Sequence, residues 1–538
     1  MTSDGAALAN SSRGRRAPAP LVACAALVAL GAVVPIAYLA LRALSADAAA
    51  RALTPLASTV DLAWDTTVLA FGVVVAALLV GVPFAWLVVR TDLPGRRAWG
   101  VAASLPLVIP SFVAALALLG ALAPRGLLQE LLEPLGVERL PEVSGYWGAL
   151  VALTLATYPY VYLLAASGLR GADPTAEEAA RSLGARPVAV FWRVTLPALR
   201  PSLAAASLLV ALYVLSDFGV VSLMGYSTLT TGIYLRYESL LALESAAIMA
   251  LVLVALALAI VLIASRGRLR GAIYRSTPGA GRAAKPVTLG AWRWPALAFC
   301  SFVVGFFLVL PVGVLVWWSV GADPVGGRAP IAWSAAVNSA WVSTAAAMIA
   351  ALVVLPTAIL VWRYPSALSR GLERLTLLPG ALPGIAVALA LVFFGARIGS
   401  PVYQSIGLLL GAYVIRFMPF GLASTRASLD AVSPRLEDAA RSLGRGSIGA
   451  MTAVVLPLAH SGILAGAALV FLSTIKELPA TLLLKPIGFE TLATEIWSGT
   501  AIGAYSDVAP SALLLIVVAA PVVYLLTWRN AWQLGAAE

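Results

Sequence analysis

Residues 173–197 read DPTAEEAARSLGARPVAVFWRVTLP, and residues 433–457 read SPRLEDAARSLGRGSIGAMTAVVLP. The two stretches lie 260 residues apart and share the block Ala-Ala-Arg-Ser-Leu-Gly, at 179–184 and 439–444. Self-similarity at a fixed offset is the signature of a repeated structural unit. The chain is therefore predicted to contain two copies of one unit.

Residues outside this block recur at similar spacing. Segment 228–234 (TLTTGIY) resembles segment 491–497 (TLATEIW), and the other pairs are related by offsets of 260 or 273. These pairs are Asp217 with Glu477, Pro159 with Pro419, Pro106 with Pro379, and Pro110 with Pro383. The 13-residue difference between the offsets matches an extra acidic stretch around 130–142. The repeat therefore extends over most of each half.

The composition is that of a membrane protein. Of the 538 residues, 61% are hydrophobic and 11% are charged, whereas soluble proteins carry about 25% charged residues. Apolar runs of about 20 residues, enough to cross a bilayer, predict twelve spans, of which the ninth and tenth are broken by prolines 379, 383 and 419. The spans are 20–41, 66–89, 101–123, 146–169, 202–224, 243–265, 295–318, 336–362, 376–395, 402–424, 458–480 and 509–528.

Basic residues alternate between loops. The two termini and every second loop hold 26 Lys and Arg, and the opposite loops hold 8. The positive-inside rule then predicts that both termini are cytoplasmic. The net charge of +11 is explained by this asymmetry, so we expect a lipid bilayer and no nucleic acid as partner.

These observations predict an all-α polytopic membrane protein built from two parallel six-helix repeats. Six is an even number, so both copies have the same orientation. The predicted segments are a cytoplasmic tail (1–19), a first half (20–265), a basic cytoplasmic linker (266–294), a second half (295–528) and a cytoplasmic tail (529–538). Both repeated loops, 173–197 and 433–457, are expected on the cytoplasmic side.

Each repeated loop is predicted to start with a short capped helix. Asp173-Pro174 and Ser433-Pro434 suit a helix N-terminus, where carboxylates are also favoured, and a glycine can stop the helix. A helix with small residues on one face suits docking into the groove of a partner, although an ordinary surface helix is the alternative. The residues concerned are Glu177, Glu178, Ala179, Ala180, Leu183, Gly184, Leu196 and Pro197 in the first copy, and Glu437, Asp438, Ala439, Ala440, Leu443, Gly444, Leu456 and Pro457 in the second.

This pattern resembles the EAA loop of ABC-importer permeases: Glu-Ala-Ala, three residues, Gly, nine residues, an aliphatic residue, one more, then Leu-Pro. In the second copy the glutamate is replaced by Asp438. The resemblance implies a fused permease of the type I importer fold, whose two loops dock on two copies of a cytoplasmic ATPase. No lysine here stands in a P-loop, so ATP and Mg would be used by that partner, with no cofactor bound by this chain and no catalytic residue in it.

Charged residues at membrane depth are costly and are usually functional or paired. Asp217, Lys476 and Glu477 are therefore candidates for the translocation path, and a structural ion pair is the alternative. Tyr226, Tyr234 and Glu495 are candidates for lining an outer vestibule, with interfacial anchoring as the alternative for the tyrosines.

The strings around Asp217 and Glu477 resemble those of the ferric-iron branch of fused permeases. That branch works with an extracytoplasmic ferric-binding protein, which implies Fe(III) as the substrate and a bacterial inner-membrane location. Related permeases carry thiamine, polyamines or phosphonates, and these stay open, as does an ion-coupled secondary transporter. One histidine and two cysteines predict no metal site in the chain itself.

Overall fold

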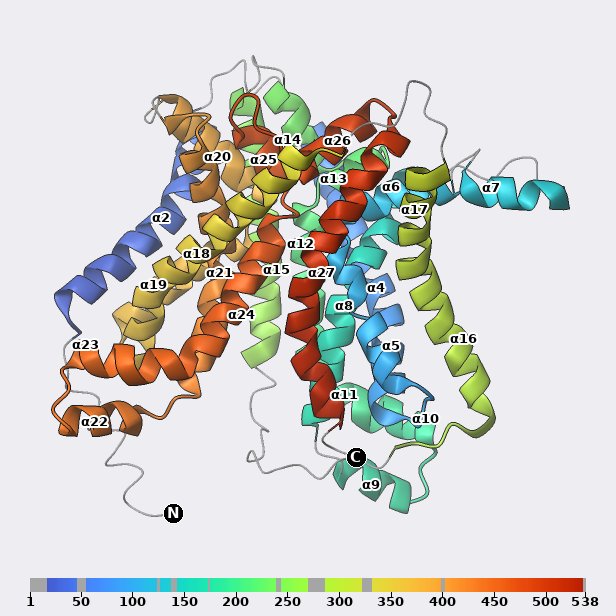
Figure 1. The fold of residues 1–538 in the computed structure, drawn as a ribbon, viewed down its shortest axis with the longest axis horizontal. Coiled ribbons are helices and arrows are strands. Elements are labelled where there is room, and N and C mark those ends of the chain that lie inside the picture. The colour runs from blue at the N-terminus through green and yellow to red at the C-terminus, as the bar shows by residue number, and fades with distance from the viewer. Residues whose placement is uncertain are drawn as a thin grey trace. The chain divides into compact units, whose positions relative to one another are not determined.

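The computed structural model describes residues 17–45, 55–122, 126–136, 143–172, 175–238, 243–269, 286–321, 331–397 and 402–535. Within these ranges the regular secondary structure is helical, apart from one isolated β-bridge, and turns and short loops connect the helices (Figure 1). Among the described residues, ten helices are long and apolar enough to cross a membrane, or up to twelve if two bent pairs each count as one span. The predicted all-α polytopic fold is thus confirmed. The predicted Asp173-Pro174 helix start, most of the linker and most of the N-terminal tail lie outside the described residues.

The long helices coincide with the predicted spans to within several residues at most ends. In the first half they are α2 (Ala19–Leu44), α4 (Leu56–Arg90), α6 (Ser111–Leu122), α8 (Gly145–Gly171), α12 (Arg200–Ser216) and α15 (Leu243–Leu269). In the second half they are α16 (Arg293–Val304) with α17 (Leu310–Gly321), α18 (Trp333–Arg363), α20 (Gly384–Arg397), α21 (Ile406–Asp430), α24 (Leu456–Thr474) and α27 (Tyr505–Gly535).

Shorter helices connect or cap the spans. They are α5 (Arg96–Ala102), α7 (Leu127–Leu132), α9 (Thr175–Ser182), α10 (Pro187–Val190), α11 (Leu196–Ala198), α13 (Gly219–Leu223), α14 (Leu229–Glu238), α19 (Ala367–Leu377), α22 (Pro434–Ser442), α23 (Ser447–Ala450), α25 (Pro479–Leu484) and α26 (Leu492–Ala501). Pro419 lies inside α21, so the predicted break of the tenth span at this proline is wrong. Neighbouring helices allow a proline inside a span by covering the freed backbone groups.

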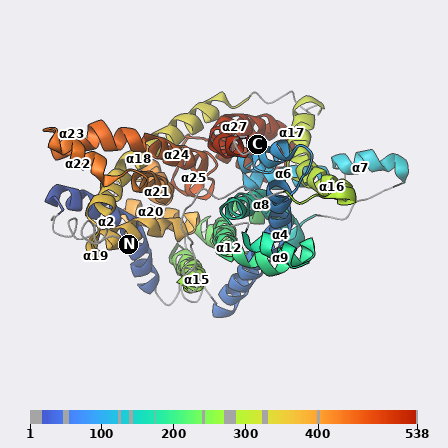
Figure 2. The same cartoon turned by 90° about the horizontal axis from the view of Figure 1, so that it is seen from below.

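The first compact unit comprises residues 1–47 and 334–493. Its helix α2 packs beside α19 and α20 (Figure 2). Ala25 and Ala29 of α2 are fully buried and form a cluster with Leu360 and Leu372. Small residues let helix backbones approach closely in lipid, where association depends on close packing.

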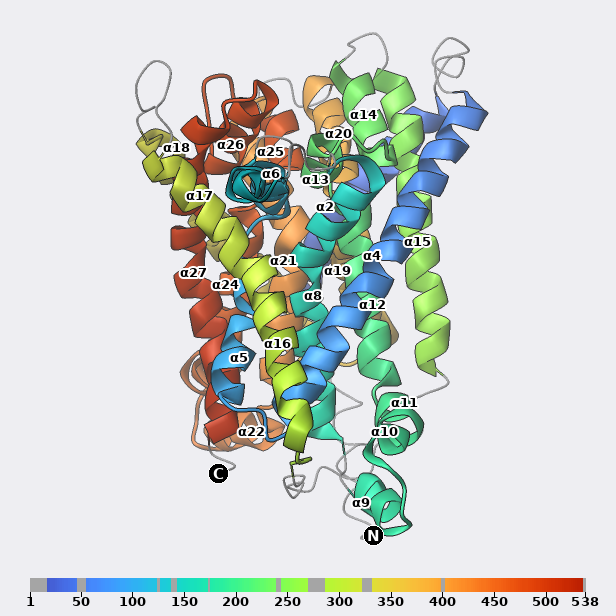
Figure 3. The same cartoon turned by 90° about the vertical axis from the view of Figure 1, so that its right-hand side faces the viewer.

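The second compact unit comprises residues 48–333 and 494–538. Its centre is formed by α4, α8 and α12, which lie side by side (Figure 3). Helix α17 packs against α6 through Ala117, Ala121 and Val314, and it also packs against α27. Gly120 lets the Trp318 ring pack closely on α6, because a Cβ at this position would lie 2.2 Å from that ring.

The compact units do not follow the two halves of the sequence. Helix α2 of the first half belongs to the first unit with most of the second half. Conversely, α16, α17 and α27 of the second half belong to the unit that contains most of the first half. Each compact unit therefore needs segments from both halves. The predicted boundaries at 265 and 295 concern the sequence repeat and stay a prediction.

One helix crossing shows the repeat at the level of single atoms. In the second unit, a Cβ on Gly168 of α8 would lie 2.5 Å from Ser202 Oγ of α12. In the first unit, a Cβ on Gly462 of α24 would lie 2.2 Å from Ser428 Cβ of α21. The sequence offset of 260 pairs Gly168 with Ser428 and Ser202 with Gly462. Both halves thus keep one glycine-on-serine crossing, with the two roles exchanged between the helices.

Candidate functional site

The first repeated loop is held by a buried carboxylate. Helix α9 carries Glu177, which is 5% exposed. Arg90, the last residue of α4, places Nη2 3.4 Å from Glu177 Oε1, and the Thr195 hydroxyl donates to the same oxygen at 3.0 Å. Arg181, one turn further along α9, lies 3.5 Å from Oε2. These contacts fix α9 to the end of a long apolar helix.

The second repeated loop uses the same anchor. Glu437 of α22 is 3% exposed, and Arg363, the last residue of α18, places Nε 2.9 Å from Glu437 Oε2. Arg363 also binds the exposed Asp438 through Nη2 at 3.0 Å. Figure 1 shows α22 and α23 at the lower end of this unit, beside the lower ends of α21 and α24. The position of Thr195 is taken by Val455, so Glu437 has no threonine partner there.

Each anchored helix ends in a left-handed glycine. Gly184 has φ +83° and Gly444 has φ +89°. The N–H groups of Ala185 and Arg445 then donate to the carbonyls of Ala180 and Ala440, at 3.0 and 3.2 Å. Such a turn satisfies the last carbonyls of a helix and favours glycine because a Cβ strains this backbone conformation.

The residues before these glycines face away from the protein. Leu183 is 88% exposed and Leu443 is 86% exposed, and Ala179 and Ala439, one turn earlier, are also exposed. By contrast, Ala440 is buried and Ala180 is half-buried. The predicted face of α9 and α22 is therefore split, with one alanine toward the protein and an alanine-leucine pair outward. Glu178 and Asp438 are on the exposed side as well.

Both loops contain a π turn before the Leu-Pro pair. The turns are Phe191–Thr195 before Leu196-Pro197, and Met451–Val455 before Leu456-Pro457. Proline has no N–H to donate, so the regular bond to the preceding turn is lost there. A single π turn is a common response and is frequent at functional positions.

Sequence reasoning missed Arg90 and Arg363, the cations that hold both loops. The offset of 273 that pairs the prolines also pairs these two arginines, so the signal was present. Both arginines stand at the ends of apolar runs among other basic loop residues, so charge pattern alone does not distinguish them. The buried carboxylates are Glu177 and Glu437, the residues before Glu178 and Asp438 of the EAA pattern.

The predicted span 202–224 places Asp217 within one continuous helix. In the structure the spanning helix α12 instead ends at Ser216, and Asp217 follows it directly. Its Oδ1 accepts the N–H of Val220 at 2.9 Å, at the start of α13. Its Oδ2 accepts the hydroxyl of Ser111, the first residue of α6, at 2.5 Å. The Thr230 hydroxyl donates to the Asp217 carbonyl at 2.8 Å. The side chain therefore joins three chain segments at the break in the span.

Glu477 has the equivalent place in the other unit but a different environment. Its Oε1 accepts the N–H of Ala480 at 3.3 Å at the start of α25, as Asp217 does for Val220. Gly384, at the position that matches Ser111, lies beside both Glu477 and Arg416, since a Cβ there would be 2.8 Å from Glu477 Oε1 and 3.0 Å from Arg416 Nε. Lys476 is half-buried in the same turn.

The vestibule candidates lie in one unit. Tyr226 donates to the Asp65 carbonyl at 3.3 Å and packs on Tyr146. Tyr234 and Trp497, which are equivalent in the repeat, both pack on the Phe218 ring, with centroid separations of 4.6 and 5.1 Å. Glu495 is half-buried on α26, two residues before this tryptophan.

Comparison with known proteins is consistent with the two-copy organisation. The profile of the family described as "Binding-protein-dependent transport system inner membrane component" matches residues 77–273 and again residues 355–533. Each match includes one anchored loop and one break at a carboxylate.

Individual relatives are similar over much of the chain. The Fe(3+)-transport system permease protein FbpB 2 of Haemophilus influenzae is 32% identical over 87% of this chain and 89% of its own. The ferric transport system permease protein FbpB of Actinobacillus pleuropneumoniae is 25% identical over 79% of this chain and 64% of its own. The molybdenum transport system permease protein ModB of Escherichia coli is 32% identical over 30% of this chain and 70% of its own.

Proposed function

The chain belongs to the family of binding-protein-dependent transport system inner membrane components, the permeases of ABC importers, and from this premise we propose that its substrate is Fe(III). The proposal is supported by the similarity to ferric transport permeases over 87% and 79% of the chain. An extracytoplasmic ferric-binding protein would deliver the iron. The permease would pass it through the inner membrane by alternating access.

The two anchored loops are proposed to couple transport to ATP hydrolysis in a separate subunit. The observation that carries this proposal is the repeated arrangement of a buried glutamate, an arginine at the end of a spanning helix, and an exposed leucine before a left-handed glycine. An exposed leucine suits insertion into the groove of a partner. The buried ion pair ties each loop to the end of a spanning helix, since removing one partner of such a pair costs about 3–5 kcal/mol. Two loops fit two ATPase copies, which would bind ATP and Mg.

The proposed coupling requires both loops to be cytoplasmic. The 26-to-8 distribution of Lys and Arg supports this orientation, with both termini inside. Asp217 and Glu477 are proposed to be positioning residues of the path, because each accepts an N–H from the first turn of the helix that continues beyond the break. Lys476, Tyr226, Tyr234 and Glu495 stay candidates for lining the path.

Uptake of radiolabelled iron tests the substrate. A strain that lacks the chain is complemented with the wild type or with the Gly184→Val/Gly444→Val double variant, at equal membrane abundance. Iron uptake that depends on the wild type and is lost in the double variant is the expected result. If the wild type takes up radiolabelled thiamine, a polyamine or a phosphonate but no iron, the assignment of Fe(III) is contradicted. Uptake driven by an ion gradient without any ATPase would contradict the transport class.

A further inference from the structure

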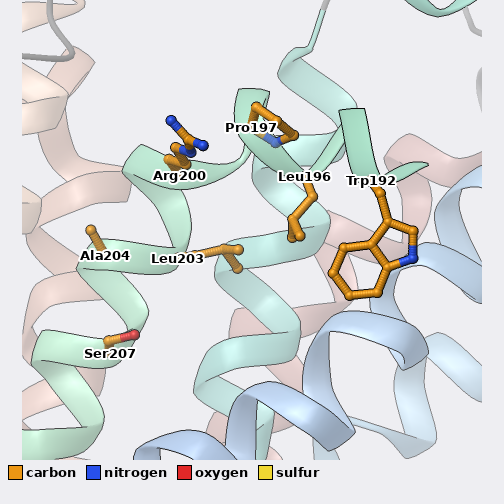
Figure 4. A pocket seen from close by; sticks show the side chains of 7 residues that line it. All are labelled: Trp192, Leu196, Pro197, Arg200, Leu203, Ala204 and Ser207. Atoms are coloured by element: carbon orange, nitrogen blue, oxygen red, sulfur yellow. The ribbon is translucent and has the colours of Figure 1, made fainter. Parts of the chain in front are cut away.

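A groove opens at the elbow between the first repeated loop and the spanning helix α12. The chain bends by 63° between Phe191–Ala198 and Arg200–Ser216, and the groove on this bend has a volume of about 330 Å³. Leu196, Leu203 and Ala204 line its apolar side. The Trp192 indole and Arg200 flank it from opposite sides (Figure 4). We call this space the elbow groove.

The segment that forms the elbow groove is purely cationic. Between Glu178 and Asp217 the sequence contains four arginines and no carboxylate. Arg181 is paired with Glu177, as described above. Arg193 and Arg200 are exposed, and neither forms an ion pair with another residue in the described part of the chain. The groove thus combines an apolar floor with one lining cation, Arg200, and Arg193 follows the lining Trp192 directly in the sequence.

The elbow lies where a spanning helix meets the aqueous phase. Helix α12 begins at Arg200, and Trp192 is 62% exposed just before it. Tryptophan and arginine at such a boundary are typical of the headgroup level of a membrane. The inner leaflet carries anionic lipids, which attract basic side chains close to the surface.

We propose that the elbow groove binds one anionic phospholipid of the cytoplasmic leaflet. Its phosphate is bound by Arg200 through a charge-assisted hydrogen bond, which an arginine or a lysine can donate, and the nearby Arg193 adds positive charge. One acyl chain lies along Leu196 and Leu203, and the Trp192 indole packs at the glycerol level. The apolar floor favours a lipid over a free phosphate ion, and the absence of a carboxylate among the described lining residues favours an anionic headgroup over a zwitterionic one.

The second half provides a matched control within the same chain. The positions equivalent to Trp192, Arg193 and Arg200 are Thr452, Ala453 and His460. The helix there runs as one span from Ser447 to Thr474, without the bend. The His460 ring nitrogen Nδ1 lies 2.6 Å from the Pro457 carbonyl oxygen. Lipid selectivity is therefore assigned to the first half alone, with one site per chain.

Native mass spectrometry of the purified permease–ATPase complex tests the proposal. The complex is supplied with phosphatidylglycerol or phosphatidylcholine, and the bound lipid is counted. Retained phosphatidylglycerol is expected for the wild type, with a loss of about tenfold in Arg200→Gln, as for the loss of one charged hydrogen bond. Trp192→Ala should also lose lipid, whereas Arg200→Lys and His460→Gln should retain it. The loss in Arg200→Gln with retention in Arg200→Lys also separates headgroup binding from misfolding.

Several outcomes would overturn the proposal. Equal retention of phosphatidylcholine would show an apolar groove without headgroup recognition. Displacement of the signal by inorganic phosphate alone would point to a free anion. Lipid bound by the isolated permease but absent from the complex would mean that the ATPase covers the groove. Because the measurement counts lipid and not iron, this proposal and the assignment of Fe(III) can fail independently.

Discussion

Replacing Arg363 by Gln removes the guanidinium that lies 2.9 Å from Glu437 and 3.0 Å from Asp438. The two contacts differ in burial. The Glu437 side chain is 4% exposed, whereas the Asp438 side chain is 57% exposed. Removing one partner of a buried ion pair costs about 3–5 kcal/mol, and an exposed pair contributes about 0–1 kcal/mol. The expected loss is therefore about 3 kcal/mol, at the lower end of that range. It comes mostly from the Glu437 carboxylate, which is stranded except for Arg441 Nη1 at 4.0 Å.

Hydrogen exchange followed by mass spectrometry measures this loss directly in peptides that cover 434–444. Lowering the free energy of local opening by about 3 kcal/mol raises the exchange rate of α22 amides by about two orders of magnitude. The rate of fully exposed amides is the upper limit of this increase. Asp438→Asn is the matched control and should change the rate by no more than about fivefold.

The double variant Arg363→Gln/Glu437→Gln separates the explanations. It removes the stranded charge, so part of the protection of α22 should return. If Arg363→Gln and Asp438→Asn raise exchange equally, the buried contact is not what holds α22. If the second substitution restores nothing, the stranded carboxylate is not the source of the loss.

Three other predictions concern single positions. Gly184→Val should uncouple ATP hydrolysis from uptake, because the left-handed backbone at this position is strained by a branched side chain although a Cβ meets nothing within 4 Å. Gly184→Asn should have a milder effect, since asparagine adopts this conformation more readily. Equal effects of both variants on the ratio of ATP hydrolysis to uptake would refute this explanation. Asp217→Ala should lower the stability of the purified complex by about 1–2 kcal/mol through loss of a helix cap, and Asp217→Asn should lower it by less. Thermal unfolding of the two variants checks this order, and an equal loss of stability argues for a role of the charge. Gly384→Ala should destabilise by about 1–3 kcal/mol because its Cβ would crowd Glu477 and Arg416, whereas Ser111→Ala should lose only one hydrogen bond of about 1 kcal/mol; a tolerated Gly384→Ala would show that this pair can move apart.

Local chemistry made much of the molecule predictable from its sequence. Apolar length predicted the spans, and the offset of 260 predicted that two loops share one structure, as the anchors on Glu177 and Glu437 show. The left-handed turns at Gly184 and Gly444 follow from the residue type. These features depend on residues close together in the chain, where composition and spacing carry the information.

Long-range contacts were harder to predict. The break of α12 at Asp217 was missed because an apolar run on both sides looks like one continuous span. What ends the helix is a set of distant partners, Ser111 and Thr230, which no local pattern reveals. The packing of α2 with most of the second half of the sequence was missed for a related reason. In lipid, helices meet through small residues such as Ala25 and Ala29, and alanine is common throughout this chain.

The placement of α2 has a consequence for the biogenesis of the chain. About 290 residues separate the end of α2 at Leu44 from the start of α18 at Trp333. At roughly 5–20 residues per second, a ribosome needs on the order of 15–60 s for that interval. During this time α2 has to remain in the bilayer without α19 and α20, its packing partners. Its mean hydropathy of 2.4 makes a lipid-surrounded single helix stable. The second half therefore recruits a helix inserted long before it, so synthesis of the two halves as one polypeptide keeps that helix within reach.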